Sequence, residues 1–157
     1  MAISFQFNQI FKPSFFRVTK IKPWLNAIAQ NENRIISNLS YIFMNDEDLR
    51  KINIEYLNHD TYTDIITFDT LEDFDIPTDR LSKFKIAIYK AKAIEGDIFI
   101  SLERVEENAK KFNTTFENEL LRVMAHGLLH LCGYKDKKKA DIEMMRKKEE
   151  ESLMMLL

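Results

Sequence analysis

The feature that most constrains this chain is a histidine pair, His126 and His130, set four residues apart in an apolar segment. Residues four apart share one face of an α-helix, so both imidazoles can reach a single divalent metal ion. Gly133 predicts the end of that helix, because glycine adopts the left-handed conformation of a C-terminal cap without strain. The chain can then turn back and supply Asp136 as a third ligand. Three protein ligands leave one tetrahedral position open, as in a catalytic zinc site.

Histidine pairs at this spacing also occur as packing or surface residues. Three features favour a metal site here: the helix is otherwise apolar, a glycine stop follows, and a carboxylate comes directly after the stop. We therefore predict one zinc ion per chain, bound by His126, His130 and Asp136. A carboxylate ligand also gives more room to metals other than zinc. Cys132 is predicted to be a buried thiol that points away from the histidine face.

The two histidines also match the ends of the H-E-x-x-H signature of zinc peptidases. In that signature a glutamate follows the first histidine and acts as general base. Gly127 occupies this position here, so the proton acceptor of a peptidase is missing. We expect no peptidase activity.

The same segment resembles a longer signature, H-G-x-L-H-L-x-G-Y-D-H, which belongs to the YbeY family of endoribonucleases, the rRNA maturation factors. The matching positions are His126, Gly127, Leu129, His130, Leu131, Gly133 and Tyr134. Lys135 stands where the family has aspartate, and Asp136 stands where it has a third histidine. Aspartate remains a zinc ligand with a bond length close to that of imidazole.

Two further blocks resemble the same family in the same order. The segment 53–68 is similar to L-N-x-x-Y-R-x-x-D-x-P-T-D-V-L-S-F, and 96–101 is similar to G-D-I-x-I-S. The matches in the first of these are Asn53, Tyr56, Asp60, Thr63, Asp64 and Phe68. Leu57 replaces the family arginine that is associated with RNA handling. That role is therefore lost or moves to another basic residue.

The resemblance implies a single-strand-specific, metal-dependent endoribonuclease acting in late small-subunit maturation, at the 3′ end of 16S rRNA. Its partners would be single-stranded rRNA, the small ribosomal subunit and assembly factors. The metal would polarise a phosphoryl oxygen or activate water for attack on phosphorus. No side chain is assigned as catalytic base. Arg122, four residues before His126, is the candidate phosphate contact, and Lys135 and Lys137 flank Asp136.

Two other functions fit the same residues. One is a metal hydrolase of another substrate. The other is a noncatalytic ribosome-assembly factor with a structural metal, for which a closed shell of four ligands is expected.

Composition limits the domain count, the mode of RNA binding and the cellular compartment that can be expected for this chain. At 157 residues the chain is expected to form one domain, 1–157. A net charge of −2 is not that of a nonspecific nucleic-acid binder, so any RNA contact must use a local basic patch. The single cysteine fits a reducing compartment. No signal peptide or membrane-length apolar run is recognised, and we expect a cytoplasmic protein without membrane contact.

Periodicity predicts an α+β fold with a four-stranded mixed sheet, about five helices and the metal site on a late helix. The expected strands are 3–7, 39–43, 65–68 and 97–100, the first ones parallel. The expected helices are 23–33, one capped by Asn45, one from Ser101 to 111, one from a Thr114 cap to 131, and one from 139. Residues 71–93, rich in charge, are expected to be an exposed loop or short hairpin. Tyr56, Ile142 and Met145 are expected to face inward.

Overall fold

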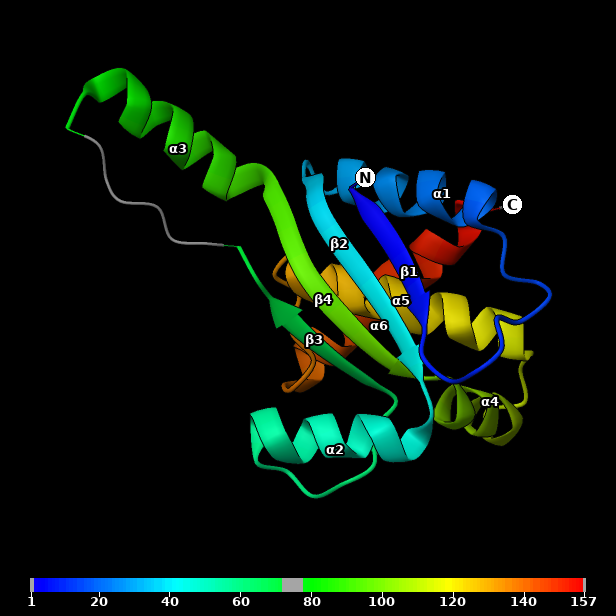
Figure 1. Cartoon of the computed structure of the whole chain (residues 1–157). Helices are drawn as coiled ribbons and strands as arrows, with labels where there is room; N and C mark the ends of the chain where they lie inside the picture. The colour runs from blue at the N-terminus through cyan, green and yellow to red at the C-terminus, as the bar shows by residue number, and fades with distance from the viewer. Residues whose placement is uncertain (1, 72–77, 157) are drawn as a thin grey trace.

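The computed structural model describes residues 2–71 and 78–156, which form four strands and six helices in one α+β domain (Figure 1). In chain order the elements are β1 (Ile3–Phe7), α1 (Val18–Asn31), β2 (Ile35–Met44), α2 (Asp46–Leu57), β3 (Ile65–Asp69), α3 (Arg80–Lys92), β4 (Ala93–Ser101), α4 (Leu102–Lys111), α5 (Phe116–Leu131) and α6 (Lys139–Met154).

The four strands form one mixed sheet in the order β1-β2-β4-β3. Strand β2 pairs in parallel with both β1 and β4, and β3 runs antiparallel to β4 at the edge. The mixed sheet and its parallel first strands were predicted and are confirmed. Strand β4 begins four residues earlier than expected, because Ala93 and Ile94 continue the pairing with Ile35 and Ile36 of β2.

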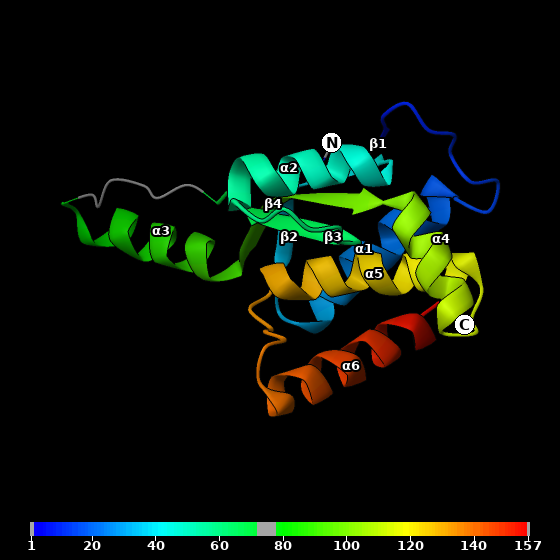
Figure 2. The same ribbon diagram turned by 90° about the horizontal axis from the view of Figure 1, so that it is seen from below.

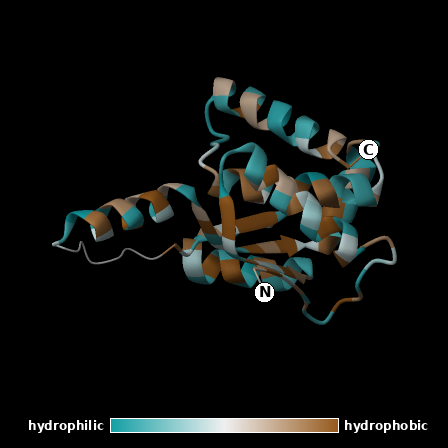
Figure 3. Ribbon diagram, turned by 90° about the horizontal axis from the view of Figure 1, so that it is seen from above, coloured by the Kyte–Doolittle hydropathy of each residue, from teal (hydrophilic) through white to brown (hydrophobic). Residues whose placement is uncertain are grey.

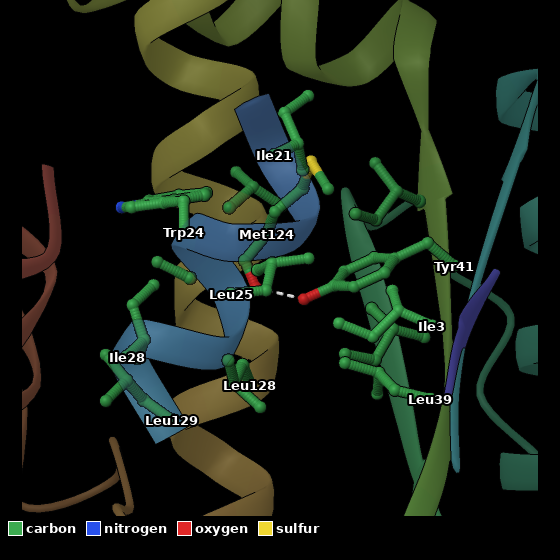
Figure 4. Close-up of a cluster of buried hydrophobic side chains, with 14 of the residues drawn as sticks. Ile3, Ile21, Trp24, Leu25, Ile28, Leu39, Tyr41, Met124, Leu128 and Leu129 are labelled. Carbon is green, nitrogen blue, oxygen red and sulfur yellow. Dashed lines mark hydrogen bonds between the residues drawn. The ribbon is translucent and has the colours of Figure 1, made fainter. Parts of the chain in front are cut away.

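The helices cover the two faces of the sheet unequally. Figure 2 shows α2 on one face, and α1, α5 and α6 on the other. The larger core lies under α1 and α5, where apolar side chains from both helices meet those of the strands (Figure 4). Within it the buried hydroxyl of Tyr41 donates a hydrogen bond to the carbonyl oxygen of Met124, at 2.9 Å. The smaller core under α2 is built around Met44, Leu49 and Ile66.

Helix α5 is the element most enclosed by this arrangement. Nine of its 16 residues are buried, and it packs against α1, α4, α6 and the sheet. Helix α6 in turn lies on α5 (Figure 2), and the indole nitrogen of Trp24 donates a hydrogen bond to the carbonyl oxygen of Ser152, at 2.7 Å. The position of α5 relative to the sheet is therefore set from several sides.

The expectation of a loop or hairpin across 71–93 is wrong for its second half, which forms helix α3. The charges suggested an irregular segment, but lysine, alanine and leucine are strong helix formers, and Asp79 caps the first turn by accepting from the amide of Ser82. The acidic residues Glu72, Asp73 and Asp75 lie outside the described residues. Six helices are therefore described where about five were expected.

Several element boundaries and faces also differ from expectation. Helix α1 begins at Val18 rather than Pro23, because Ile21, Leu25 and Ile28 together bury one continuous face. The cap of α5 is Thr115, not Thr114. The expected caps Asn45 and Ser101 are confirmed by hydrogen bonds from Asp48 and Arg104 amides.

Two side chains expected to face inward do not. Tyr56 is 64 % exposed and Ile142 is 42 % exposed, whereas Met145 is buried as predicted. Ile142 shares the helical stripe of Met145, Glu149 and Ser152, but it lies in the first turn of α6, where that stripe is no longer buried. Across residues 2–71 and 78–156, no helix is both long and apolar enough to span a bilayer.

Candidate metal centre

The C-terminal end of α5 presents the two predicted histidines. The helix closes as predicted at Gly133, whose φ of 106° is left-handed. The amide of Tyr134 donates to the carbonyl of Leu129, and the amide of Gly133 donates to that of His130. This is the paired hydrogen bonding of a Schellman cap. It reverses the chain within a few residues and brings Asp136 back beside the last turn of α5.

The ring of His130 is oriented by its Nδ1 atom. This atom lies 2.9 Å from the carbonyl oxygen of Tyr134, which can only accept, so Nδ1 carries the hydrogen and donates it. In the neutral imidazole Nε2 is then the lone-pair atom. The cap that ends the helix therefore also selects the tautomer that a metal ligand needs.

The ring of His126 is oriented in the same way by a different residue. Its Nδ1 lies 2.6 Å from a carboxylate oxygen of Glu149, on α6. Burial alone would raise the pKa of Glu149, but hydrogen bonds from His126 and Arg122 outweigh it and hold that pKa below its ordinary value. The carboxylate is thus ionised at neutral pH and accepts the Nδ1 hydrogen. The Nε2 atom of His126 is left facing the site.

Both Nε2 atoms face one oxygen of Asp136. The separations are 3.3 Å from His126 and 3.2 Å from His130. Donors around a tetrahedral zinc ion, at bond lengths of about 2.0–2.2 Å, stand roughly 3.3–3.6 Å apart. With both Nδ1 atoms protonated, neutral histidines turn lone pairs toward a carboxylate, an arrangement that a bound cation stabilises. The donor set therefore fits a divalent metal.

Three protein donors form this cluster within the described part of the chain: His126, His130 and Asp136, with ligand atoms lying within 4.8 Å of one another. Cys132 is not among them. As predicted it packs against the core, although it is only partly buried, and burial raises the pKa of its thiol to about 11. A set of three leaves room for a further ligand, which counts against a closed structural site.

Arg122 contacts the carboxylate that orients His126, not the three-donor cluster itself. Its guanidinium donates to both carboxylate oxygens of Glu119, at 2.8 and 2.9 Å, and to Glu149, at 2.8 Å. These two carboxylates are buried, and the ion pairs raise the pKa of Arg122 above its ordinary value. The phosphate contact predicted for Arg122 is still a prediction, but these contacts direct the guanidinium toward holding Glu149 on His126.

Gly127 lies where α5 crosses β3 and β4. A Cβ atom at this position would stand 2.9 Å from Ile65 and 3.0 Å from Ile98. A side chain at this position would require the side chains of Ile65 and Ile98 to shift. The residue that replaces the peptidase glutamate therefore lies against the sheet, where glycine permits close packing of α5.

A pocket of about 700 Å³ opens in front of the metal cluster. It is lined by β3, by the loop before it and by the cluster itself. His59 and Lys137 line it, as does Leu57, the residue that replaces the family arginine. The half-buried Asp64 also lines it, and burial raises the pKa of this carboxyl group, an effect that Arg122 and His126 offset only in part.

Sequence reasoning named the three donors that the structure brings together but missed Glu149. No local signal singles it out, since Glu150 and Glu151 follow it directly. The one usable sign is that Glu149 lies four residues after Met145 and so shares its inward face. His59 and Lys137 reach the pocket from segments far apart in sequence, and only Lys137 was noted beforehand.

Comparison with known proteins decides the family. The family profile described as Endoribonuclease YbeY matches residues 6–156. The chain belongs to the YbeY endoribonuclease family.

Relatives that carry the YbeY name agree over most of the chain. An Endoribonuclease YbeY of Flavobacterium johnsoniae is 51% identical over 132 residues, covering 84% of this chain and 82% of the relative. One from Bacteroides fragilis is 40% identical over 155 residues, covering 99% and 98%. A solution structure of a Thermotoga maritima protein aligns with a TM-score of 0.59 at 28% identity, covering 96% of this chain and 88% of the other. The resemblance inferred from three sequence blocks is thus confirmed.

Proposed function

We propose that this chain is a single-strand-specific, metal-dependent endoribonuclease that acts in late small-subunit maturation, at the 3′ end of 16S rRNA. The observation that carries the proposal is the three-donor cluster opening onto a pocket, in a member of a family named for endoribonuclease activity. The whole domain, 1–157, would serve this one activity. Its partners would be the small ribosomal subunit and assembly factors, in the cytoplasm.

His126, His130 and Asp136 would hold the metal. Two imidazoles and one carboxylate form a donor set typical of catalytic zinc, so zinc, one per chain, is the proposed metal. When bound, such a cation supplies Lewis acidity toward a phosphoryl oxygen and lowers the pKa of water. Glu149 and the Tyr134 carbonyl hold the two imidazoles in the required orientation.

The pocket supplies the remaining groups from this chain. His59 and Lys137 are the side chains proposed to hold phosphate charge, because Leu57 provides none and Arg122 is engaged with Glu119 and Glu149. A pocket of this size suits nucleotides splayed out of a flexible strand rather than a rigid duplex. That preference supports cleavage of single-stranded RNA.

The test in solution measures metal content and RNA cleavage together. Wild-type protein purified without added metal should contain about one zinc per chain and cut single-stranded RNA faster than the matching duplex. His126→Ala and His130→Ala should lose both the metal and the cleavage. Cleavage of another phosphoester or of peptides, with RNA left intact, would contradict the proposal and favour a hydrolase of another substrate.

The third ligand is tested by charge. Asp136→Asn should weaken zinc binding, while Asp136→His, which restores the family residue, should retain it. Asp141→Asn, a nearby aspartate outside the cluster, is the matched control and should leave zinc affinity unchanged. Equal zinc affinity in Asp136→Ala and wild type would remove Asp136 from the metal site.

The cellular role is tested in a strain that lacks the gene. Wild type should correct the small-subunit rRNA 3′ ends, and His126→Ala should not. If both correct them equally, the metal has no chemical part there, and a noncatalytic assembly factor becomes the better description.

A further inference from the structure

Helix α3 differs from the other helices in the described part of the chain by having no buried residue. Figures 1 and 2 show it projecting from one end of the sheet, away from the helices that cover the two faces. It holds five basic residues and no acidic one: Arg80, Lys83, Lys85, Lys90 and Lys92. In a protein with a net charge of −2, this arm is a local concentration of positive charge.

Apolar and aromatic side chains are interspersed with these charges, as the alternating colours of α3 in Figure 3 show. Phe84 is 63 % exposed, Leu81 is 62 % exposed and Ile88 is 43 % exposed. Tyr89 is held at the base of the arm by a hydrogen bond from its hydroxyl to Glu95, at 2.8 Å. Basic residues combined with exposed aromatic rings are the means by which proteins bind single strands without reading their sequence.

The arm is continuous with the pocket of the metal centre. Helix α3 runs directly into β4, and Gly96 of β4 pairs with Asp69, the last residue of β3. Asp69 lines the pocket together with His126 and His130 of the metal cluster. Leu131, directly after His130, packs against Gly96, and Arg34 donates to the carbonyl oxygens of Lys92 and Cys132. The base of the arm therefore adjoins the C-terminal end of α5, which carries the two histidines.

We propose that the α3 arm binds the single-stranded RNA that flanks the cleavage position and guides it into the adjoining pocket. This inference rests on the proposed function and extends it by assigning a substrate-docking surface. An anionic membrane surface also suits a basic amphipathic helix. The path from arm to pocket favours RNA, because a flexible polyanion can occupy both at once.

The test removes charge from the arm without touching the pocket. The arm variant is Lys83→Gln/Lys85→Gln/Lys92→Gln, three exposed residues of α3. Its matched control is Lys12→Gln/Lys20→Gln/Lys110→Gln, which removes the same charge from exposed lysines of the β1–α1 loop, α1 and α4, at the other end of the molecule (Figure 1). Both variants should fold and retain zinc, which circular dichroism and metal analysis verify.

Binding is measured with a single-stranded RNA of about 20 nucleotides, using metal-free protein so that it is not cut. The arm variant should bind about 10- to 100-fold more weakly near 0.1 M salt, and its log–log salt slope should be shallower by about 2. The control variant should bind as wild type does. Phe84→Ala should weaken single-strand binding about fivefold or more, through lost stacking, and leave duplex binding unchanged.

The kinetics of RNA cleavage distinguish a defect in substrate docking from a defect in catalysis. On long single-stranded RNA the arm variant should show a raised KM with an unchanged kcat, and on a tetranucleotide it should match wild type. Equal RNA affinity and salt slope in the arm and control variants would overturn the inference. So would loss of binding to phosphatidylglycerol vesicles alone, with RNA binding intact, which would make the arm a membrane surface.

The two proposals fail in different ways. If wild type cuts no RNA but the arm variant still loses affinity for it, the proposed function fails and the docking surface stands. If cleavage depends on His126 but both triple variants bind and cut long RNA as wild type does, the docking surface fails and the proposed function stands.

Discussion

Helices α5 and α3 are of similar length, 16 and 13 residues, and each has a side-chain N-cap, yet they occupy opposite environments. Nine residues of α5 are buried and none of α3. Two of the three donors of the candidate metal cluster, His126 and His130, lie on the first, and the second carries five basic residues and no acidic one. Metal donors must be held to within about 0.5 Å, which packing from several sides provides. Contact with a flexible polyanion depends mainly on charge and tolerates looser positioning.

The largest difference between the two helices is expected when one apolar side chain is shortened in each. Leu128 is fully buried and Phe84 is 63 % exposed. Leu128→Ala should lower the free energy of unfolding by about 2–5 kcal/mol, since it leaves a cavity between α5 and the sheet. Phe84→Ala should change it by no more than about 0.5 kcal/mol. Urea titration measures both, and a cost above about 1 kcal/mol for Phe84→Ala would show that the arm packs against the domain.

A second difference is expected between two glutamates of α6: Glu149, which contacts His126, and Glu151, which is the control. Glu149→Gln keeps the shape of the side chain but removes the charge that accepts from His126 and Arg122. Zinc affinity should fall about 10- to 100-fold, because the imidazole loses its orienting partner. Glu151→Gln, two residues later and 44 % exposed, is the matched control. Competition with a fluorescent chelator measures the affinity, and equal values for the two variants would exclude a role for Glu149.

The smallest difference is expected at the helix caps. Thr115 accepts from the amide of Asn118 at the start of α5, and Asp79 accepts from that of Ser82 at the start of α3. Thr115→Ala should lower global stability by about 1 kcal/mol. Asp79→Ala should leave global stability unchanged, because α3 adds no buried surface, and should speed amide hydrogen exchange within α3 alone. Faster exchange in the sheet of the Asp79→Ala protein would contradict this separation.

The success and failure of the sequence predictions follow the same division between the two helices. On α5, the apolar period, the histidine spacing and Gly133 agree with one another, and the helix and its end were both predicted. On α3 the charges masked the helical pattern, and no residue of this helix is buried. Sequence patterns reveal a helix best when one of its faces is buried in a core.

The sequence by itself determined the three-donor cluster, because its donors lie between His126 and Asp136 and one helical turn with its cap sets their geometry. Only the tertiary structure decided what surrounds it. Glu149 reaches His126 because α6 packs on α5, and Arg122 turns toward that carboxylate for the same reason. The pocket exists because β3 lies at the edge of the sheet beside α5. Local hydrogen bonding fixes neighbours within a turn, whereas contacts between distant segments depend on which faces the whole chain can bury.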